Sequence, residues 1–414
     1  MSTQPLSANA DARRDRSARA DVSGVSPRLT LLMALACGLI VANIYYVQPL
    51  LPDLAASFRA PTGVVGLSVT TTQLGYAAGL VLLVPLGDLM AKRRLVVVLL
   101  CASAVALALT AVANSPTMLL ITLALVGLSS VAVNVLMPLA ATLAGDGQRG
   151  RVVGSLMTGL LLGVLLARTV SGALEEIAGW HAVFGIAALV EVVLAVVLRL
   201  ALPDPPVARG LTYPQLLTSI TRLVRDEPFL RRRMMIGALG FASFQLLWTS
   251  LPFLLAGPPY SFSTATIGSF GLIGAAGVLC AQAAGRLQDK GMAHAATGVF
   301  ALVLGASWLL LGGGAEMLPL LVIGIVVLDI GVQGLHVINQ GRIYAYGPSV
   351  KSRVTTAYMT SYFVGGSLGG ALAVTLYTRF GWIGVCVAGG VLFALTGILW
   401  LTDRTKAPSP ELTK

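Results

Sequence analysis

The chain has 414 residues, of which 56% are hydrophobic and only 11% are charged, and its mean hydropathy is +0.85. Soluble domains carry about 25% charged residues, so this composition excludes a soluble globular protein. The net charge of +11 comes with no visible base-reading element, and we attribute it to membrane topology and anionic lipid rather than to nucleic acid.

The first 28 residues are predicted to be a disordered cytoplasmic tail. Arg13, Arg14, Arg16 and Arg19 stand among Ala, Ser and Asp, and the segment has no apolar core. A secretory signal requires such a core, so we do not interpret the segment as one.

From residue 29 onward, the chain consists of apolar runs of membrane length. A helix needs about 20 apolar residues to cross the hydrocarbon core. Pro, Gly and charged residues collect between the runs, as in Pro52-Asp53 and Gly145-Asp146-Gly147. We therefore expect an all-α integral membrane protein with twelve transmembrane helices, at 29–51, 62–86, 94–114, 117–143, 151–175, 180–202, 231–256, 263–286, 293–312, 315–341, 353–378 and 380–402.

These segments form two predicted six-helix bundles, 29–202 and 231–402, joined by a cytoplasmic linker at 203–230 and followed by a cytoplasmic tail at 403–414. The linker has an amphipathic pattern, with apolar residues facing Arg222 and Arg225. Such a helix would lie on the inner membrane surface. We prefer the simpler interpretation, a tether that tolerates motion between the halves.

The positions of Lys and Arg predict that both termini are cytoplasmic. With the N-terminus inside, 25 of the 28 basic residues fall on cytoplasmic segments, and the others are Arg59, Arg168 and Arg379. Loops rich in Lys and Arg stay on the cytoplasmic side of the membrane.

The chain also repeats itself at an offset near 202 residues. Arg151-Val152 returns as Arg353-Val354, and Gly179-Trp180 returns as Gly381-Trp382. Many secondary transporters are built from two membrane halves related in this way, with the substrate site between them near the bilayer midplane. Transport is therefore the leading hypothesis.

The cysteines give no sign of a metal site or cofactor. Cys37, Cys101, Cys280 and Cys386 each stand alone in a different predicted helix, without metal-ligand spacing. We expect four reduced thiols, no metal and no cofactor.

A loop after the second segment carries an acid followed by cations, Asp88 with Lys92 and Arg93, and it has a second copy around Asp289 after the eighth segment. This arrangement resembles the Gly-x-x-x-Asp-Arg-x-Gly-Arg-Arg signature of the major facilitator superfamily. The first copy departs from that pattern at three positions: Val84, Leu89 and Ala91. The resemblance implies that these charges form a cytoplasmic gate contact between the halves, weak enough to break in each cycle.

The fifth segment resembles the Gly-x8-Gly-x3-Gly-Pro-x2-Gly-Gly signature of the drug/proton antiporters of that superfamily. The corresponding positions are Gly154, Gly163, Ala167, Arg168, Ser171 and Gly172, with Ala, Arg and Ser in place of the signature's Gly, Pro and Gly. Generic small-residue packing between helices explains the same pattern equally well. Residues 48–53, with Pro49 and Pro52, resemble the Pro-x-x-Pro end of helix 1 in these exporters. Together the resemblances imply the superfamily fold in a bacterial inner membrane.

Few ionisable groups lie within the predicted helices, and each needs a partner, a water-filled cavity or a function, because charge in hydrocarbon is costly. Four stand out: Arg168, Glu191, Asp329 and His336. In the tenth segment Asp329, Gln333, His336 and Gln340 follow i, i+4, i+7, i+11 spacing and share one helical face.

The family's fold lines its central cavity with helices 1, 4, 7 and 10, and polar or aromatic residues recur there at positions related by the repeat. The substrate-binding candidates are Asn43, Tyr46, Asn134, Gln245, Trp248, Gln333 and His336. Aromatic faces with a few hydrogen-bonding groups suit an amphipathic small molecule. Alternatively, Tyr45, Tyr46 and Trp248 are interfacial anchors, and Asn134 forms an interhelical hydrogen bond.

Asp329 is the first candidate for proton coupling, because burial disfavours the charged form of a carboxyl group and lets it exchange a proton as access alternates. His336 would share or relay that proton. Glu191 ranks second, since helix 6 is usually a scaffold helix in this fold. We assign Gly163 and Arg168 to gating, with Arg168 in an ion pair; the alternatives for Arg168 are an anionic substrate or snorkelling to the surface.

The sequence thus predicts a transporter rather than an enzyme, one that exports a small organic solute, such as a drug-like compound, a sugar or a metabolite, by proton antiport with alternating access. Uptake by proton symport or facilitated diffusion is the alternative, and a transporter-like membrane sensor is a more distant one. No Gly-x4-Gly-Lys-Ser/Thr phosphate loop for ATP hydrolysis is present. Because one chain holds both halves of the site, we expect that it can work as a monomer.

Overall fold

The computed structural model describes residues 25–145, 147–203, 212–347 and 350–403, and these residues contain helices and no strand. The first bundle comprises α2 (Pro27–Ala42), α3 (Leu51–Phe58), α4 (Thr62–Leu82), the 3₁₀ helix η1 (Val84–Asp88), α5 (Lys92–Ala111), α6 (Pro116–Ser129), α7 (Ala132–Leu143) and α8 (Arg149–Ala201). The second comprises α10 (Pro228–Ala256), α11 (Thr264–Ser269), η2 (Phe270–Gly274), α12 (Ala275–Asp289), α13 (Ala293–Gly313), α14 (Leu318–Ile343) and α15 (Lys351–Leu401), and α9 (Tyr213–Asp226) lies between them in the chain.

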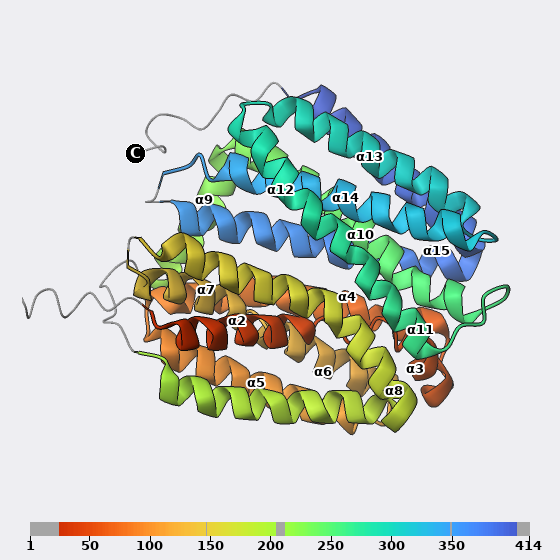
Figure 1. Cartoon of the computed structure of the whole chain (residues 1–414), viewed down its shortest axis with the longest axis horizontal. Helices are drawn as coiled ribbons and strands as arrows, with labels where there is room; N and C mark the ends of the chain where they lie inside the picture. The colour runs from red at the N-terminus through yellow and green to blue at the C-terminus, as the bar shows by residue number, and fades with distance from the viewer. Residues whose placement is uncertain (1–24, 146, 204–211, 348–349, 404–414) are drawn as a thin grey trace, which may run out of the picture.

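The long helices of both bundles run along one direction (Figure 1). Among the described residues, eight helical stretches are long and apolar enough to cross a membrane, and two shorter apolar helices, Pro27–Ala42 and Thr264–Gly274, add to them. Two of the eight, α8 and α15, contain two crossings each, which gives the twelve expected. We call the two ends of the molecule the α9 end and the α3 end, after the short helices that lie there.

Single glycines join the paired crossings of α8 and α15, where the sequence predicted separate helices. Gly179 has φ +78° and Gly381 has φ +62°, and each interrupts an otherwise continuous helical run. Positive φ is a conformation that glycine adopts without penalty. Each glycine precedes a tryptophan that anchors the bend: Trp180 donates to Ser57 Oγ at 3.3 Å, and Trp382 donates to the Leu311 carbonyl at 2.7 Å. The repeat seen in the sequence therefore marks equivalent bends.

The first predicted helix, 29–51, is wrong in its extent, because α2 ends at Ala42 and residues 43–50 form turns. Short i to i−3 bonds replace the helical ones, as from Gln48 N to Tyr45 O and from Leu50 N to Val47 O. Pro49 has no N–H to donate, and a proline ring disfavours a regular helix before it. The turns are buried in the protein, which is where irregular backbone is tolerated at membrane depth.

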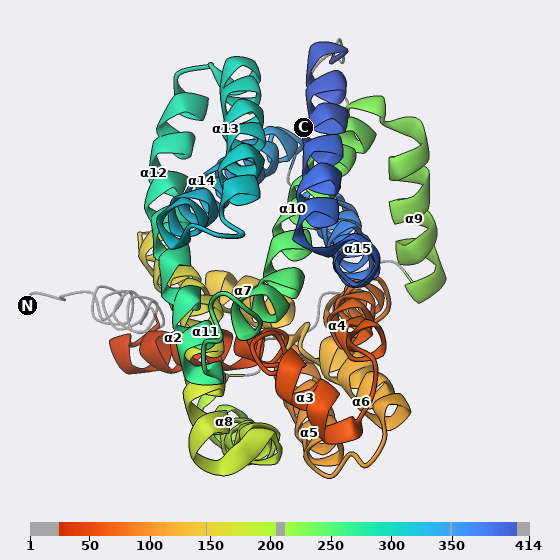
Figure 2. The same ribbon diagram turned by 90° about the vertical axis from the view of Figure 1, so that its right-hand side faces the viewer.

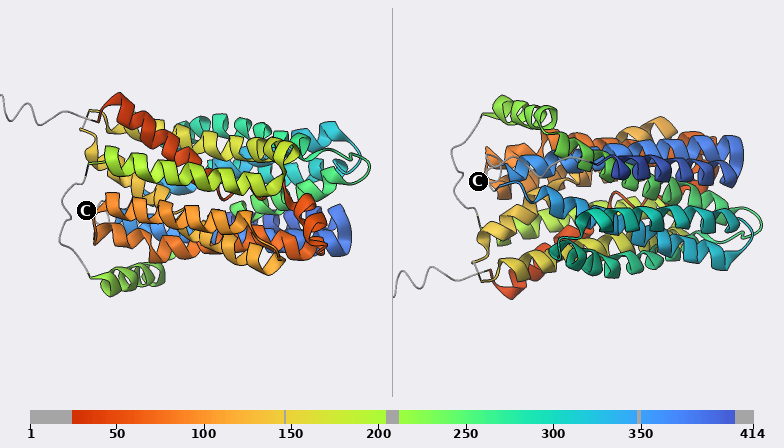
Figure 3. Two further views of the ribbon diagram at one scale, coloured as in Figure 1. Left: turned by 90° about the horizontal axis from the view of Figure 1, so that it is seen from below. Right: turned by 90° about the horizontal axis from the view of Figure 1, so that it is seen from above.

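The linker contains α9, which begins with a capping box between Thr212 and Gln215. Its apolar face is buried, and Figure 3 shows the helix beside the long helices at its end of the molecule, where it packs against α15, α10 and η1. Tyr213 donates to the Leu82 carbonyl at 2.8 Å, so α9 is attached to the first bundle as well as to the second. These contacts go beyond those of a bare tether.

The two bundles meet through α4 against α15 and through α8 against α11 and η2 (Figure 2). In the first contact, Ser367 donates to the Thr70 carbonyl at 3.3 Å. At the α3 end, Thr264 donates to Asp53 Oδ2 at 2.6 Å, and Ser263 donates to Glu176 Oε2 at 3.2 Å. Hydrogen bonds between the two bundles therefore close the α3 end.

Candidate functional site

The guanidinium of Arg168 lies between the two bundles. The residue is only 4% exposed, and its Nε donates to Gln48 Oε1 at 2.6 Å. Three aromatic rings surround Cζ, at centroid distances of 4.9 Å for Tyr45, 5.6 Å for Phe244 and 4.2 Å for Trp248. The side chain therefore points into the protein instead of snorkelling to the surface.

Asp329, on α14, is hydrogen-bonded to Trp248. It is 3% exposed, and its Oδ1 accepts a hydrogen bond from the indole N–H of Trp248 at 3.4 Å. A Cβ atom at Gly274 would lie 3.0 Å from Oδ2, so a small residue there leaves room for the carboxyl group. Trp248 thus contacts a cation with its ring face and a carboxylate with its N–H, and the opposite charges of Arg168 and Asp329 attract each other.

Two glutamines continue this connection between the bundles. Gln48 Nε2 donates to Gln245 Oε1 at 3.2 Å, and both side chains are buried. Gln48 therefore contacts Arg168 through its oxygen and Gln245 through its nitrogen. Gln245 Nε2 has no hydrogen-bond partner among the described residues, so one buried donor there is free.

Asn43 and Glu191 form a separate polar pair within the first bundle. Asn43 Nδ2 donates to Glu191 Oε1, and the carboxyl group is 1% exposed. The other oxygen of Glu191 has no hydrogen-bond partner among the residues described. Tyr46, half-buried, lies close enough for electrostatic interaction with this carboxylate. The two proton-coupling candidates therefore occupy different surroundings, one in each bundle.

The polar face of α14 divides between different neighbours. His336 Nδ1 lies 3.2 Å from Tyr358 Oη, and its ring centroid lies 4.5 Å from that of Tyr362, so this part faces α15. Gln333 is half-buried and lies beside Gly277 of α12. The shared helical face is present, but the structure gives no direct bond between Asp329 and His336.

Asn134, on α7, donates to the hydroxyl of Tyr76 at 2.6 Å. Tyr76 in turn stacks on Phe363 of the second bundle, with ring centroids 4.1 Å apart. The interhelical hydrogen bond considered for Asn134 therefore exists, and part of the side chain remains exposed.

The predicted gate residues lie at the α9 end. Asp88 is exposed and has no hydrogen bond or ion pair with a described residue, and Lys92 is half-buried. Arg93 Nη1 donates to the Leu202 carbonyl at 3.3 Å, a contact within the first bundle. The side chain of Asp289 lies outside the described part of the chain, so the gate between the halves stays a prediction.

The glycines of the signature in the fifth segment make two kinds of contact. A Cβ atom at Gly163 would lie 2.2 Å from the carbonyl oxygen of Gly38, so this glycine lets α8 approach α2 inside one bundle. Gly172 instead faces the second bundle, where its Cβ would lie 2.5 Å from the Thr264 carbonyl oxygen. Only the part of the signature near Arg168 and Gly172 therefore lies between the bundles.

Gln48 and Phe244 were not among the residues predicted from the sequence, which indicated Tyr45 only as an interfacial anchor. Gln48 was assigned to a proline-rich helix end, although it is an amide within a membrane segment, a sign of a buried polar contact. Tyr45 and Trp248 are buried and do not form an interfacial belt. Cys37, Cys101 and Cys386 are free thiols, and the side chain of Cys280 lies outside the described part of the chain.

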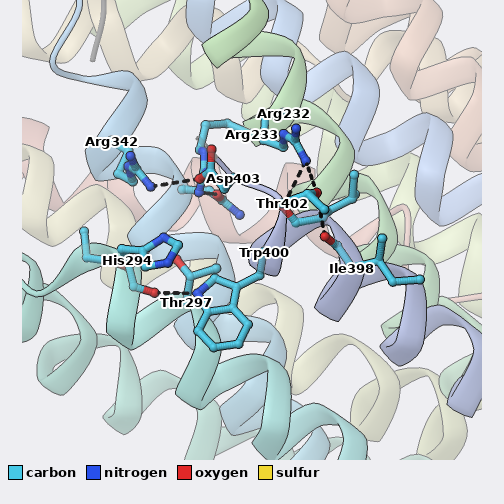
Figure 4. Close-up of polar contacts among 12 residues, drawn as sticks. Arg232, Arg233, His294, Thr297, Arg342, Ile398, Trp400, Thr402 and Asp403 are labelled. Atoms are coloured by element: carbon cyan, nitrogen blue, oxygen red, sulfur yellow. Dashed lines mark hydrogen bonds and ion pairs between the residues drawn. The ribbon is translucent and has the colours of Figure 1, made fainter. Parts of the chain in front are cut away.

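A second charged cluster lies at the α9 end of the second bundle (Figure 4). Arg233 and Asp403 form an ion pair, with side chains 0% and 2% exposed, and Arg342 reaches the same Oδ2 at 3.4 Å. Asn339 Oδ1 lies 3.5 Å from Arg233 Nη1. Arg232 donates to the Thr402 hydroxyl at 2.7 Å, so the cluster ties the chain after α15 to α10.

Tyr346 adds a contact in the turn between α14 and α15. Its hydroxyl donates to Glu227 Oε2 at 2.9 Å, and Phe229 lies beside its ring. Burial, together with the neighbouring Glu227, raises the pKa of Tyr346, so the phenol stays protonated and remains a donor. This contact joins the turn to the beginning of α10.

Comparison with known proteins assigns the family. The model of the Major Facilitator Superfamily matches residues 33–341, most of the chain. The chain belongs to this superfamily. It is similar to the uncharacterized transporter YgaY of Escherichia coli O157:H7, with 46% identity over 376 residues, 91% of this chain and 95% of the relative.

Solved structures of superfamily transporters share the fold. A bacterial homolog of the human lysosomal transporter Spinster, in an inward-facing and unoccupied conformation, has a TM-score of 0.74 at 15% identity and covers 93% of this chain and 100% of its own. A mutant of the nucleoside transporter NupG has a TM-score of 0.74 at 14% identity, with 92% and 100% covered. At these identities the likeness extends to the fold alone. The protein is thus a multi-pass membrane transporter.

Proposed function

We propose that this transporter exports a small organic solute in exchange for protons, by alternating access. The observation that carries the proposal is Asp329, a carboxyl group buried on α14 and connected through Trp248 to Arg168 of the other bundle. A buried carboxyl group in a membrane helix is costly unless it has a function. Solute and protons would use the same region between the bundles.

Protonation of Asp329 gives a physical route to coupling. Ionised Asp329 attracts Arg168 and so favours the arrangement in which α8, α10 and α14 are close. Protonated Asp329 is neutral, and this attraction is lost. Proton binding therefore shifts the equilibrium towards separation of the bundles at this point, because it interacts differently with the two arrangements.

The α3 end supplies the proposed seal. Gly172 and Thr264 are in close backbone contact there, and Asp53 accepts the bond from Thr264. With both termini cytoplasmic, as the basic residues predict, this end faces outward and the inner side is the one that takes up solute. The resemblance of the α8 segment to the antiporter signature favours export over uptake.

The remaining candidates supply the proposed solute contacts. Asn43, Tyr46, Asn134, Gln245, Trp248, Gln333 and His336 carry amide, phenol, indole and imidazole groups. Gln245 has a free buried donor among the described residues, and Asn134 and His336 keep part of their surface exposed. One chain contains every member of this set, so we expect a monomer to be active.

The test is proton movement in proteoliposomes loaded with a pH-sensitive dye. A panel of sugars, nucleosides, aromatic acids and organic cations is added, and solute and proton fluxes are followed together. We expect protons to move opposite to one class of solute. In Asp329→Asn we expect solute-driven proton flux to fall at least about tenfold while solute exchange across equal concentrations remains measurable, because the aromatic and amide groups that contact the solute are unchanged.

Glu316→Gln is the matched control, since it neutralises an exposed carboxyl group in the turn before α14. It should leave both fluxes unchanged. Full proton flux in Asp329→Asn would reject Asp329 as the coupling residue, and Glu191→Gln would then be the next variant. Protons moving in the same direction as the solute would replace antiport with symport.

A further inference from the structure

We propose that the guanidinium of Arg168 occupies a cation site built by both bundles, and that the solute is an organic monocation that takes its place. This inference deepens the proposed function and rests on it, because the site is the one through which transport is proposed to run. The chain's own side chain would then act as an internal occupant while the substrate is absent.

The surroundings of Arg168 have the chemistry of a cation receptor. The faces of Tyr45, Phe244 and Trp248 lie 4.9, 5.6 and 4.2 Å from Cζ. Aromatic faces carry negative potential, and a cation within about 6 Å of a ring centroid is attracted by the ring, most strongly where water is excluded. An anion at the same place would meet three repulsive faces.

The buried charges of this region favour a cation as well. Asp329 adjoins the aromatic rings through Trp248 and is 3% exposed. When Asp329 is ionised and the guanidinium has left the site, the buried negative charge needs compensation. A monocation or a proton supplies it, whereas an anion adds to the imbalance.

The cation site is divided between the bundles. Arg168 and Tyr45 belong to the first bundle, whereas Phe244, Trp248 and Asp329 belong to the second. Separation of the bundles therefore carries the guanidinium away on α8 and leaves two rings and a carboxyl group on α10 and α14. Those three groups are then available to a cation from solution.

The guanidinium also has an incomplete set of bonds where it lies. Nε bonds to Gln48, Nη1 reaches the Val164 carbonyl at 3.4 Å, and Nη2 has no hydrogen-bond partner among the described residues. A buried donor without a hydrogen-bond partner costs free energy, so the site binds the side chain less tightly. Arg168 is therefore suited to leave when a competing cation arrives.

The two roles considered for Arg168 predict different effects of removing its guanidinium on ligand affinity. Only the molecules in which the Arg168 side chain has left the site can bind a cation. The apparent affinity for the cation is therefore reduced in proportion to that fraction. Removing the guanidinium should strengthen binding of a cation. If Arg168 instead were the ligand for an anionic solute, its removal should weaken binding of an anion.

The experiment measures binding to the full-length protein in nanodiscs, with tetraphenylphosphonium as the cation and salicylate as the anion. Arg168→Met removes the charge and keeps much of the side-chain length, and it should bind tetraphenylphosphonium about tenfold more tightly than the parent. Arg168→Lys keeps a cation that aromatic faces attract and should stay within about threefold of the parent. Adding Trp248→Leu to Arg168→Met should abolish the gain. Size-exclusion chromatography establishes that each variant is folded and monodisperse.

Unchanged or weaker tetraphenylphosphonium binding in folded Arg168→Met would overturn the inference, as would salicylate binding in the parent that Arg168→Met abolishes. The proposed function has a separate readout. Antiport with a neutral or anionic solute, together with no gain in Arg168→Met, would leave antiport standing and reject the cation site. The expected gain, without any proton counterflow, would support the cation site and reject antiport.

Discussion

The ion pair between Arg233 and Asp403 leads to a prediction about stability. Its two side chains are 0% and 2% exposed, so neither charge is screened by water. Asp403→Asn keeps the shape of the side chain but removes the charge that compensates Arg233. The guanidinium of Arg233 then keeps the neutral Asn339 oxygen, 3.5 Å away, as an acceptor. Arg342, 19% exposed, loses a partner but remains partly hydrated.

Removing one member of a buried pair costs about 3–5 kcal/mol, because the remaining charge is buried without compensation. We expect Asp403→Asn to lower the free energy of unfolding by an amount in that range. The exposed Glu316→Gln, the same chemical change elsewhere, should stay within about 0.5 kcal/mol. The contrast between the two variants separates burial from loss of a carboxylate.

Unfolding is followed by tryptophan fluorescence in mixed micelles of dodecylmaltoside and increasing dodecyl sulfate. The decisive variant is the double substitution Arg233→Met with Asp403→Asn. Replacing both members of a buried pair by neutral groups is often close to neutral, so the double variant should be more stable than Asp403→Asn alone. If it is equally unstable, an unpaired buried charge is not the cause and the reasoning fails.

Two further predictions concern the bends and the α3 end. Gly381→Ala and Gly179→Ala place a Cβ at φ +62° and +78°, with ψ near 180°, and each should lower the free energy of unfolding by about 1–3 kcal/mol. An unchanged unfolding transition in the same micelle assay would contradict a strained backbone at these positions. Thr264→Val removes the hydroxyl that donates to Asp53 and should weaken closure by about 1 kcal/mol. Spin labels are attached at Arg59→Cys and Glu316→Cys in a cysteine-free background, and the distance between them is measured. In Thr264→Val a larger fraction of molecules should show the long distance. A distance distribution identical to that of the parent would count against a gating role for this bond.

The twelve crossings and the repeat were predictable from the sequence, since a membrane helix imposes a long apolar run whatever its neighbours are. The repeat located the equivalent bends at Gly179 and Gly381, because both need the same glycine-only conformation. The positions of the helix ends were predicted less accurately. The apolar run at 29–51 contains buried turns, and turns inside a protein are as apolar as the helices around them.

The candidate site was found in part. Arg168, Glu191 and Asp329 stand out in any sequence of this kind because charge in hydrocarbon is rare. Their partners were not predictable. The repeat related Asn43 to Gln245, yet Gln245 contacts Gln48 and Asn43 contacts Glu191. A repeat identifies equivalent positions in the two bundles, but it does not say which side chains touch, and both of these contacts join positions that the repeat does not relate.

The single-glycine bend in α8 also sets the depth of the interior charges. Arg168 precedes Gly179 by 11 residues, and Glu191 follows it by 12. On α14, Asp329 comes 11 residues after Leu318, at the same end. At about 1.5 Å per residue, each lies about 17 Å from the end, roughly half of a hydrocarbon core about 30 Å thick. The three ionisable groups therefore lie at a similar depth, so that a proton or a cation that reaches any of them from the α3 end has passed through about half the thickness of a hydrocarbon core.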